Sequence, residues 1–186
     1  MKKITELTET RWRTTYNINE YGERERDREE FIAIRPVKSI SSGPRFAHLI
    51  IDFIAFQLVI VVISYFFEIF INLTKSNVVL NLSIGLIGTL VVFLLYPGLY
   101  VLCEYMWQKT PGKYLTKTVV IDEYANKPEF RAIVLRSLIR LVPFEPLSCY
   151  QDKYSNCWHD RWSKTWVVPE EELIELKRLL VEQAEN

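Results

Sequence analysis

The chain has one long segment that is almost without charge, set between two segments that are rich in charge. Residues 46–103 contain only three charged side chains, Asp52, Glu68 and Lys75. Inside this block, residues 76–103 form a run of 28 residues with no charge. A helix of that length would extend about 42 Å, whereas the hydrocarbon core of a bilayer is roughly 30 Å thick. The pattern predicts a transmembrane helix over about residues 78–103.

A second apolar segment lies just before this run and predicts another transmembrane helix, over about residues 49–71. Its uncharged centre, residues 53–67, has 15 residues, which is about 22 Å of helix and too short to span alone. Extending the helix to residues 49–71 gives the full length and places Asp52 just inside one boundary. Because the connection between the two segments is short, the sequence predicts a mainly α fold built on an integral membrane helical hairpin.

Basic side chains cluster near the outer ends of this hairpin. These Lys and Arg residues are Arg26, Arg28, Arg35, Lys38, Arg45, Lys109, Lys113 and Lys117. The connection between the spans has Lys75 alone. Since short cytoplasmic loops carry the excess of Lys and Arg, we expect both termini of this multi-pass protein in the cytoplasm.

The charged ends of the chain predict a small cytoplasmic layer. Residues 1–42 form a polar arm, in which the run 23–30 (ERERDREE) indicates a solvated helix face or a loop. Thr110–Lys113 (TPGK) predicts a turn. Residues 114–121 and 165–168 predict two short strands that could pair. In residues 169–186, three glutamates at the start of an apolar stripe predict a C-terminal helix.

Residues 129–141 (EFRAIVLRSLIRL) predict an amphipathic helix between the two strands. Its three arginines and the following Pro143 argue against a full crossing. We therefore expect a helix in the membrane interface or a shallow re-entrant element. A third crossing is the alternative.

The overall charge excludes some classes of protein. The chain has 23 Lys and Arg and 23 Asp and Glu, and its basic residues are interleaved with acids, so we expect no nucleic-acid partner. No phosphate loop, nucleophile elbow or pair of catalytic carboxylates is present, so we expect no enzyme activity and no cofactor. Cys149, Cys157 and His159 lack a Cys-x-x-Cys pair, so we expect no metal. A cytoplasmic position also predicts reduced thiols and no disulfide.

The candidate functional residues are polar groups at the entrance to the membrane. Arg45, His48 and Asp52 are spaced three and four apart, so a helix would place them on one face. Asp52 is either a cation or proton site or part of a structural ion pair. Farther along the chain, Asp160 is expected near Arg136 and Arg140, where carboxylate–arginine pairs would stabilise the cytoplasmic layer.

Several of these segments resemble the signature of the RDD family of membrane proteins. Residues 43–52 (GPRFAHLIID) resemble its opening motif, and Thr110–Lys113 matches its Thr-Pro-Gly-Lys motif. Residues 132–140 and 158–168 are similar to its arginine-bearing and closing segments. The arginine and two aspartates that give the family its name correspond to Arg45, Asp52 and Asp160. The resemblance covers about residues 43–168, which we treat as the membrane domain.

The resemblance implies a multi-pass protein, usually of the bacterial inner membrane, for which small-ion or solute transport such as cation/proton exchange has been suggested. Since two helices cannot enclose a pore, transport would require a homo-oligomer or other membrane protein subunits. The alternative is a non-catalytic adaptor or a subunit of a larger membrane complex. Binding of anionic lipid headgroups by Arg136 and Arg140 is a third possibility.

Overall fold

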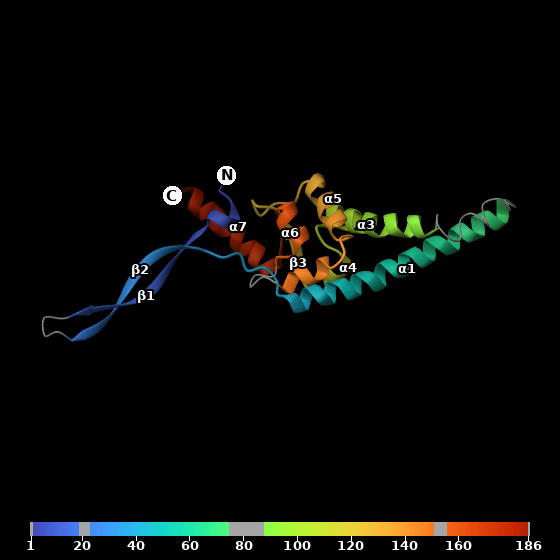
Figure 1. Cartoon of the computed structure of the whole chain (residues 1–186). Coiled ribbons are helices and arrows are strands. Elements are labelled where there is room, and N and C mark those ends of the chain that lie inside the picture. Colours follow the sequence, from blue (N-terminus) through green and yellow to red (C-terminus); the bar gives the residue numbers. More distant parts are fainter. Residues whose placement is uncertain (1, 19–22, 75–87, 151–155, 186) are drawn as a thin grey trace.

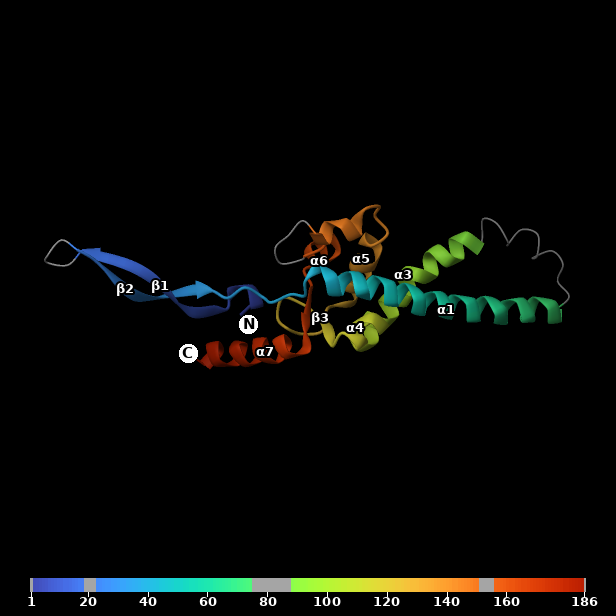
Figure 2. The ribbon, with the colours of Figure 1, turned by 90° about the horizontal axis from the view of Figure 1, so that it is seen from below.

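A computed structural model describes residues 2–18, 23–74, 88–150 and 156–185 of the chain. The fold is mainly helical with two small antiparallel sheets, as predicted. Two long helices extend from one side of a mixed central layer, and a β-hairpin extends from the other (Figures 1 and 2). The N- and C-termini lie close together beside the central layer.

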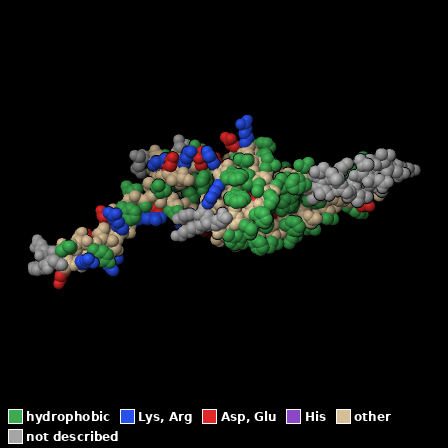
Figure 3. All heavy atoms as spheres, viewed as in Figure 1, with side chains coloured by type: hydrophobic (Ala, Val, Ile, Leu, Met, Phe, Trp, Pro, Cys, Tyr) green, Lys and Arg blue, Asp and Glu red, His purple; other side chains and the backbone are tan. Residues whose placement is uncertain are grey.

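Helix α1 (Ser42–Thr74) is the longest element. Over Ser42–Phe70 it is long and apolar enough to cross a membrane, and only 22% of its most apolar window is buried. Large apolar side chains such as Phe53, Leu58 and Phe66 are exposed along it, and Figure 3 shows apolar side chains gathered where the helical half joins the central layer. In water such a surface would be unfavourable, so α1 is suited to lipid. The helix begins at Ser42, seven residues before the predicted span, because Arg45 and His48 have partners inside the protein.

Helix α3 (Gly88–Trp107) lies beside the first half of α1. Aromatic rings join the two helices: the Phe56 ring centroid is 4.8 Å from that of Tyr100 and 5.8 Å from that of Tyr96. The predicted second span, residues 78–103, has its first ten residues outside the described part of the chain. A hairpin of two transmembrane helices therefore stays a prediction.

The central layer contains four short helices and one two-stranded sheet. Their bounds are α4 Pro111–Leu115, β3 Thr118–Ile121, α5 Phe130–Ile139, η3 Glu145–Tyr150, α6 Trp158–Ser163 and β4 Trp166–Pro169. Strands β3 and β4 pair antiparallel with Val120 opposite Val167, so the predicted pairing is confirmed. The predicted start of the first strand at residue 114 is wrong, because residues 114 and 115 belong to α4 and β3 begins at Thr118. The predicted turn at Thr110–Lys113 is wrong, because Pro111 occupies the first position of a helix, where its fixed φ is favourable.

Helix α5 has ten residues, about 15 Å of helix, which is half the thickness of the hydrocarbon core. It packs against α3 and α6. A third crossing by this segment is therefore excluded by its length.

The two ends of the chain share one hydrophobic core. Helix α7 (Glu170–Glu185) follows β4 directly, and the 3-10 turn η1 (Ile4–Glu6) packs beside it. Ile4, Leu7, Val168 and Leu176 are buried in this core. Arg35 also binds Glu172 of α7 through two hydrogen bonds of 2.7 and 3.0 Å.

The charged run of residues 23–30 lies in a β-hairpin, so the expectation of a helix face or loop is wrong. Strands β1 (Thr8–Ile18) and β2 (Arg24–Ile34) pair antiparallel along their whole length. Opposite charges meet across the strands, as in the Arg13–Glu29 pair at 2.7 Å, and such cross-strand pairs favour a sheet. The sequence pattern did not predict this hairpin because charged residues dominate β2.

Candidate functional site

The polar face of α1 points into the central layer. Arg45, His48 and Asp52 are all buried. Each has its own partners, and among the described residues no ion pair joins Arg45 to Asp52. The predicted stripe therefore exists, but its members bind groups in or next to three other elements, α4, β3 and α6, instead of one another.

Asp52 is held by neutral donors. The Thr110 hydroxyl donates to Asp52 Oδ2 at 2.7 Å, and the Gly112 backbone N–H donates to Asp52 Oδ1 at 2.7 Å. A Cβ atom on Gly112 would lie 2.8 Å from His48 Cα and 3.1 Å from Asp52 Oδ1. The Thr-Pro-Gly segment thus docks on α1 because glycine permits the approach and the carboxylate accepts the free N–H groups of a helix start.

His48 extends the same contact. Its Nε2 atom forms a hydrogen bond with the Thr116 hydroxyl and lies 3.5 Å from the Thr118 hydroxyl. Together with Asp52, His48 attaches α4 and the start of β3 to α1.

Asp160 is the centre of an arginine–carboxylate–arginine bridge. Arg45 Nη1 donates to Asp160 Oδ2 at 2.5 Å, and Arg136 Nη1 donates to Asp160 Oδ1. The Arg136 Nη1 atom is also 2.5 Å from the Thr165 hydroxyl. The structure therefore brings Asp160 together with Arg136, as expected, and also with Arg45, which sequence analysis had not linked to it. Three elements, α1, α5 and α6, meet at this bridge.

Glu104, at the end of α3, is a second centre of charge and is completely buried. It accepts hydrogen bonds from Lys113 Nζ at 3.1 Å, Arg136 Nε at 3.0 Å and Arg140 Nη2 at 2.8 Å. Arg140 thus contacts Glu104, whereas the sequence placed it near Asp160. Since Arg136 binds both carboxylates, the two centres form one network.

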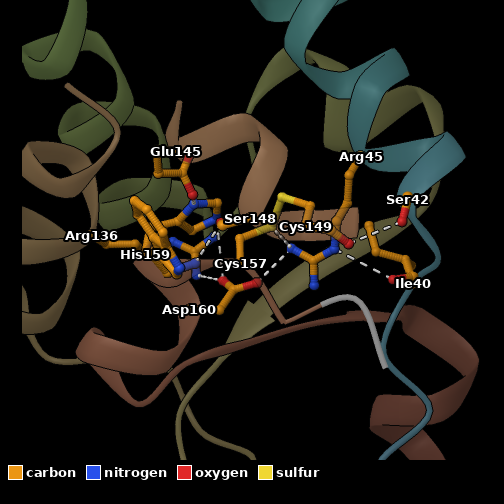
Figure 4. The surroundings of a disulfide bond; sticks show 11 residues. Ile40, Ser42, Arg45, Arg136, Glu145, Ser148, Cys149, Cys157, His159 and Asp160 are labelled. Atoms are coloured by element: carbon orange, nitrogen blue, oxygen red, sulfur yellow. Dashed lines mark hydrogen bonds and ion pairs between the residues drawn. A yellow bond between two sulfur atoms is a disulfide. The ribbon is translucent and has the colours of Figure 1, made fainter. Parts of the chain in front are cut away.

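A third group lies between η3 and α6. His159 Nδ1 is 2.5 Å from Glu145 Oε1. Beside this pair, Cys149 and Cys157 form a disulfide, so the expectation of reduced thiols is corrected. Their sulfurs lie at bonding distance because η3 and the start of α6 pack face to face. Figure 4 shows the disulfide between the Glu145–His159 pair and Arg45, whose Nη1 atom is 3.3 Å from Cys157 Sγ.

A chamber of about 110 Å³ lies where these groups converge. Its polar walls include Arg45, His48, Asp52, Arg136 and Arg140, and its apolar walls include Tyr100. One guanidinium nitrogen of each of the three arginines, Arg45 Nη2, Arg136 Nη2 and Arg140 Nη1, is buried without a hydrogen-bond acceptor among the described residues. The chamber is therefore bordered by the Asp52 carboxylate and by residues of all three arginines.

The formal charges of the described groups in and around this network balance. The four cations are Arg45, Lys113, Arg136 and Arg140, and the four carboxylates are Asp52, Glu104, Glu145 and Asp160. Burial would raise the pKa of Asp160, but the Arg45 and Arg136 charges hold it well below its usual range. Burial, opposed in part by Glu104, lowers the pKa of Lys113. Burial also lowers the pKa of His159 to about 4, so this histidine is neutral at pH 7.

Sequence reasoning missed Glu104, Glu145 and the role of Lys113. Glu104 had one visible signal, since it is the first charged residue after the uncharged run of residues 76–103. A single acid at the membrane boundary needs cationic partners, and three follow in the sequence. Nothing in the spacing of Glu145 pointed to His159.

A long apolar helix and a buried ionic network beneath its first turns define a membrane-associated helical protein. The RDD family model matches residues 41–164, which is most of the chain, and the protein belongs to the RDD family. No curated protein and no solved structure matches the chain.

Proposed function

We propose that the protein transports a small ion or solute across the bacterial inner membrane, with cation/proton exchange at Asp52 as the mechanism. In this proposal α1 and the segment 78–103 both span the bilayer, and both termini lie in the cytoplasm. It acts without enzymatic chemistry, and it works as an oligomer because two helices do not enclose a path.

The observation that supports transport is the burial of Asp52 without an ion pair among the described residues. Glu104 and Asp160 each bind at least two cations directly, whereas Glu145 binds His159, which is neutral at pH 7. Among the described residues Asp52 accepts hydrogen bonds from a hydroxyl and a backbone N–H and has no ion pair; it is 1% exposed and borders the chamber. A buried carboxylate without a direct ion pair attracts a small cation.

Exchange follows from competition for this carboxylate. A proton and a monovalent cation neutralise the same charge, so binding of one releases the other. The neighbouring arginines keep their own carboxylates throughout, so Asp52 is the carboxylate that takes part in the exchange. In an oligomer, the chamber would open alternately toward the two sides of the membrane.

The test is Asp52→Asn in proteoliposomes that contain a pH-sensitive dye. Wild-type protein should release or take up protons when Na⁺, K⁺ or Li⁺ is added, and the variant should lose this response. Asparagine fits the site, because its oxygen still accepts from Gly112 and its amide can donate to the Thr110 hydroxyl.

Asp27→Asn provides the matched control, since Asp27 lies exposed on the β-hairpin. It should keep the wild-type response. Absence of proton movement in wild-type vesicles with all three cations would refute the exchange proposal, and so would a full response from Asp52→Asn.

The β-hairpin favours a second candidate, an adaptor or subunit of a membrane complex. The pairing register places Trp12, Tyr16, Ile18, Ile32 and Ile34 on one face of the hairpin, and all five are more than half exposed. Arg24, Arg26 and Arg28 lie on the same face. An apolar and basic face on a projecting arm is suited to an acidic protein partner.

Native mass spectrometry in a gentle detergent tests the adaptor. Ile32→Ser should remove a co-purified subunit, whereas Phe31→Ser, the neighbour on the opposite face, should retain it. A wild-type chain that emerges only alone or as homo-oligomers would count against the adaptor.

A further inference from the structure

The contact between η3 and α6 gathers four buried side chains of the types that bind zinc. Glu145 and Cys149 come from η3, Cys157 is the residue before α6, and His159 lies in its first turn. All four are at most 8% exposed. Zinc sites in proteins use this mixture of thiolate, imidazole and carboxylate ligands.

The ligand atoms of these side chains lie in two overlapping groups, in each of which they are close to the spacing of ligands around one zinc ion. Those of Glu145, Cys149 and Cys157 lie within 4.8 Å of one another, and Cys157 forms a second such group with His159 and Asp160. Bonds of about 2.0–2.3 Å in a tetrahedral site separate the ligand atoms by roughly 3.3–3.8 Å. His159 Nδ1 is 2.5 Å from Glu145 Oε1, so the ion would replace the proton that these two atoms share.

Asp160 is not available as the fourth ligand, because Arg45 and Arg136 bind its two oxygens. Glu145 has no such ion pair with an arginine among the described residues, and it lies beside both sulfurs. The two groups share Cys157, and joining them without Asp160 gives Glu145, Cys149, Cys157 and His159 as the proposed ligand set (Figure 4).

The charges around the site suit a bound dication. Two thiolates, one carboxylate and Zn²⁺ carry a net charge of −1, and Arg45 lies at hydrogen-bond distance from Cys157 Sγ. A guanidinium beside a cysteine favours the thiolate form. The same arginine joins the site to the Asp160 bridge.

The disulfide and the metal site exclude each other. Zinc requires two separate thiolates, whereas the Cys149–Cys157 bond uses both sulfurs. A dithiol reductant breaks this S–S bond by supplying two electrons and two protons, and it becomes a disulfide itself. Zinc then binds the two thiols and releases their two protons.

We propose that the reduced chain binds one Zn²⁺ ion where η3 meets α6, through Glu145, Cys149, Cys157 and His159, and that formation of the disulfide excludes the ion. On oxidation, the Cys149–Cys157 disulfide thus replaces the zinc ion as the crosslink between η3 and the start of α6, beside the Asp160 bridge. In the cell this rests on the cytoplasmic orientation of the proposed function, where thiols are kept reduced.

Metal analysis of the full-length protein in detergent tests the site independently of transport and orientation. One sample is treated with an oxidant and another with a phosphine reductant. Thiol titration verifies that the reduced sample has both thiols free in addition to Cys103. After addition of Zn²⁺ and removal of the excess, the reduced chain should retain one equivalent and the oxidised chain none. Co²⁺ in the reduced chain should give thiolate charge-transfer and tetrahedral absorption bands.

Two serine variants separate this site from adventitious binding. Cys149→Ser should lose the zinc and the thiolate band, whereas Cys103→Ser should keep both, because Cys103 lies in α3 outside the cluster. The comparison of oxidised and reduced wild type remains decisive if Cys149→Ser misfolds. A fully reduced chain that retains no zinc, or zinc retained equally by the oxidised chain, would overturn the proposal.

Discussion

Replacing Asp160 with asparagine tests the bridge at the centre of the fold. Asp160 is 1% exposed and accepts from Arg45 at 2.5 Å and from Arg136. Asparagine keeps the size of the side chain but removes the negative charge. Arg136 would retain Glu104 as a counter-charge, whereas Arg45 would retain no carboxylate partner among the described residues.

Breaking a buried ion pair by removing one partner costs about 3–5 kcal/mol, because an uncompensated charge stays in a low dielectric. For a chain of this size, each kcal/mol lowers the melting temperature by about 2–4 °C. We therefore expect Asp160→Asn to melt roughly 6–20 °C below wild type, as followed by tryptophan fluorescence in detergent.

Glu29→Gln is the matched control. Its pair with Arg13, at 2.7 Å, is also in direct hydrogen-bond contact, but both side chains are more than half exposed. Exposed pairs contribute at most about 1 kcal/mol, so this variant should melt within about 4 °C of wild type. Equal melting temperatures for Asp160→Asn and Glu29→Gln would refute the reasoning that burial makes the Asp160 bridge essential.

Three further predictions concern other parts of the fold. Gly112→Ala should destabilise the protein by about 1–3 kcal/mol in thermal unfolding, because its Cβ would lie 2.8 Å from α1 backbone, whereas Gly98→Ala, with nothing within 4 Å, should not. Leu176→Ala, in the core, should cost about 2–5 kcal/mol in urea unfolding, and the exposed Ile174→Ala less than 1 kcal/mol. In the oxidised chain, burial lowers the pKa of His159 from 6.5 to about 4. Between these two pH values the unfolded state binds a proton that the folded state does not, so the free energy of unfolding should fall by about 3 kcal/mol as the pH drops from 6.5 to 4. His159→Gln should reduce this dependence of the unfolding free energy on pH.

The sequence predicted the long apolar helix α1 and the pairing of β3 with β4, because both patterns are local. An uncharged run and a pair of β-branched segments have the same interpretation whatever surrounds them. The β-hairpin was missed because charged residues dominate β2, and their alternation becomes meaningful only opposite Arg13 and its neighbours in β1. Pairing across a sheet is a relation between two segments, which neither segment shows alone.

The sequence identified residues of the site, but it did not identify which of them bind one another. Arg45, Asp52 and Asp160 do converge on one buried region. Their pairing was different, because Asp52 binds the start of α4 and leaves Arg45 to Asp160. The free N–H groups of that short helix could not be foreseen while Thr110–Lys113 was taken for a turn, so one error of secondary structure changed the whole assignment of charges.

Arg136 makes the bridge and the Glu104 centre a single unit, and a double-mutant cycle measures this coupling. Its Nε atom binds Glu104 at 3.0 Å and its Nη1 atom binds Asp160. In Asp160→Asn or Glu104→Gln alone, Arg136 keeps one carboxylate. In the double variant it keeps none, so the loss of stability should exceed the sum of the single losses by about 0.5–3 kcal/mol.

The same cycle with Glu29→Gln in place of Glu104→Gln should be additive, because Glu29 lies on the β-hairpin and shares no partner with Asp160. If Glu104 and Asp160 were also additive within about 0.5 kcal/mol, Arg136 would not transmit charge between them. The network would then be two independent ion pairs, and the end of α3 would be fixed to the layer separately from the start of α1. An excess loss would instead mean that the attachment of both α1 and α3 to the central layer depends on one buried guanidinium.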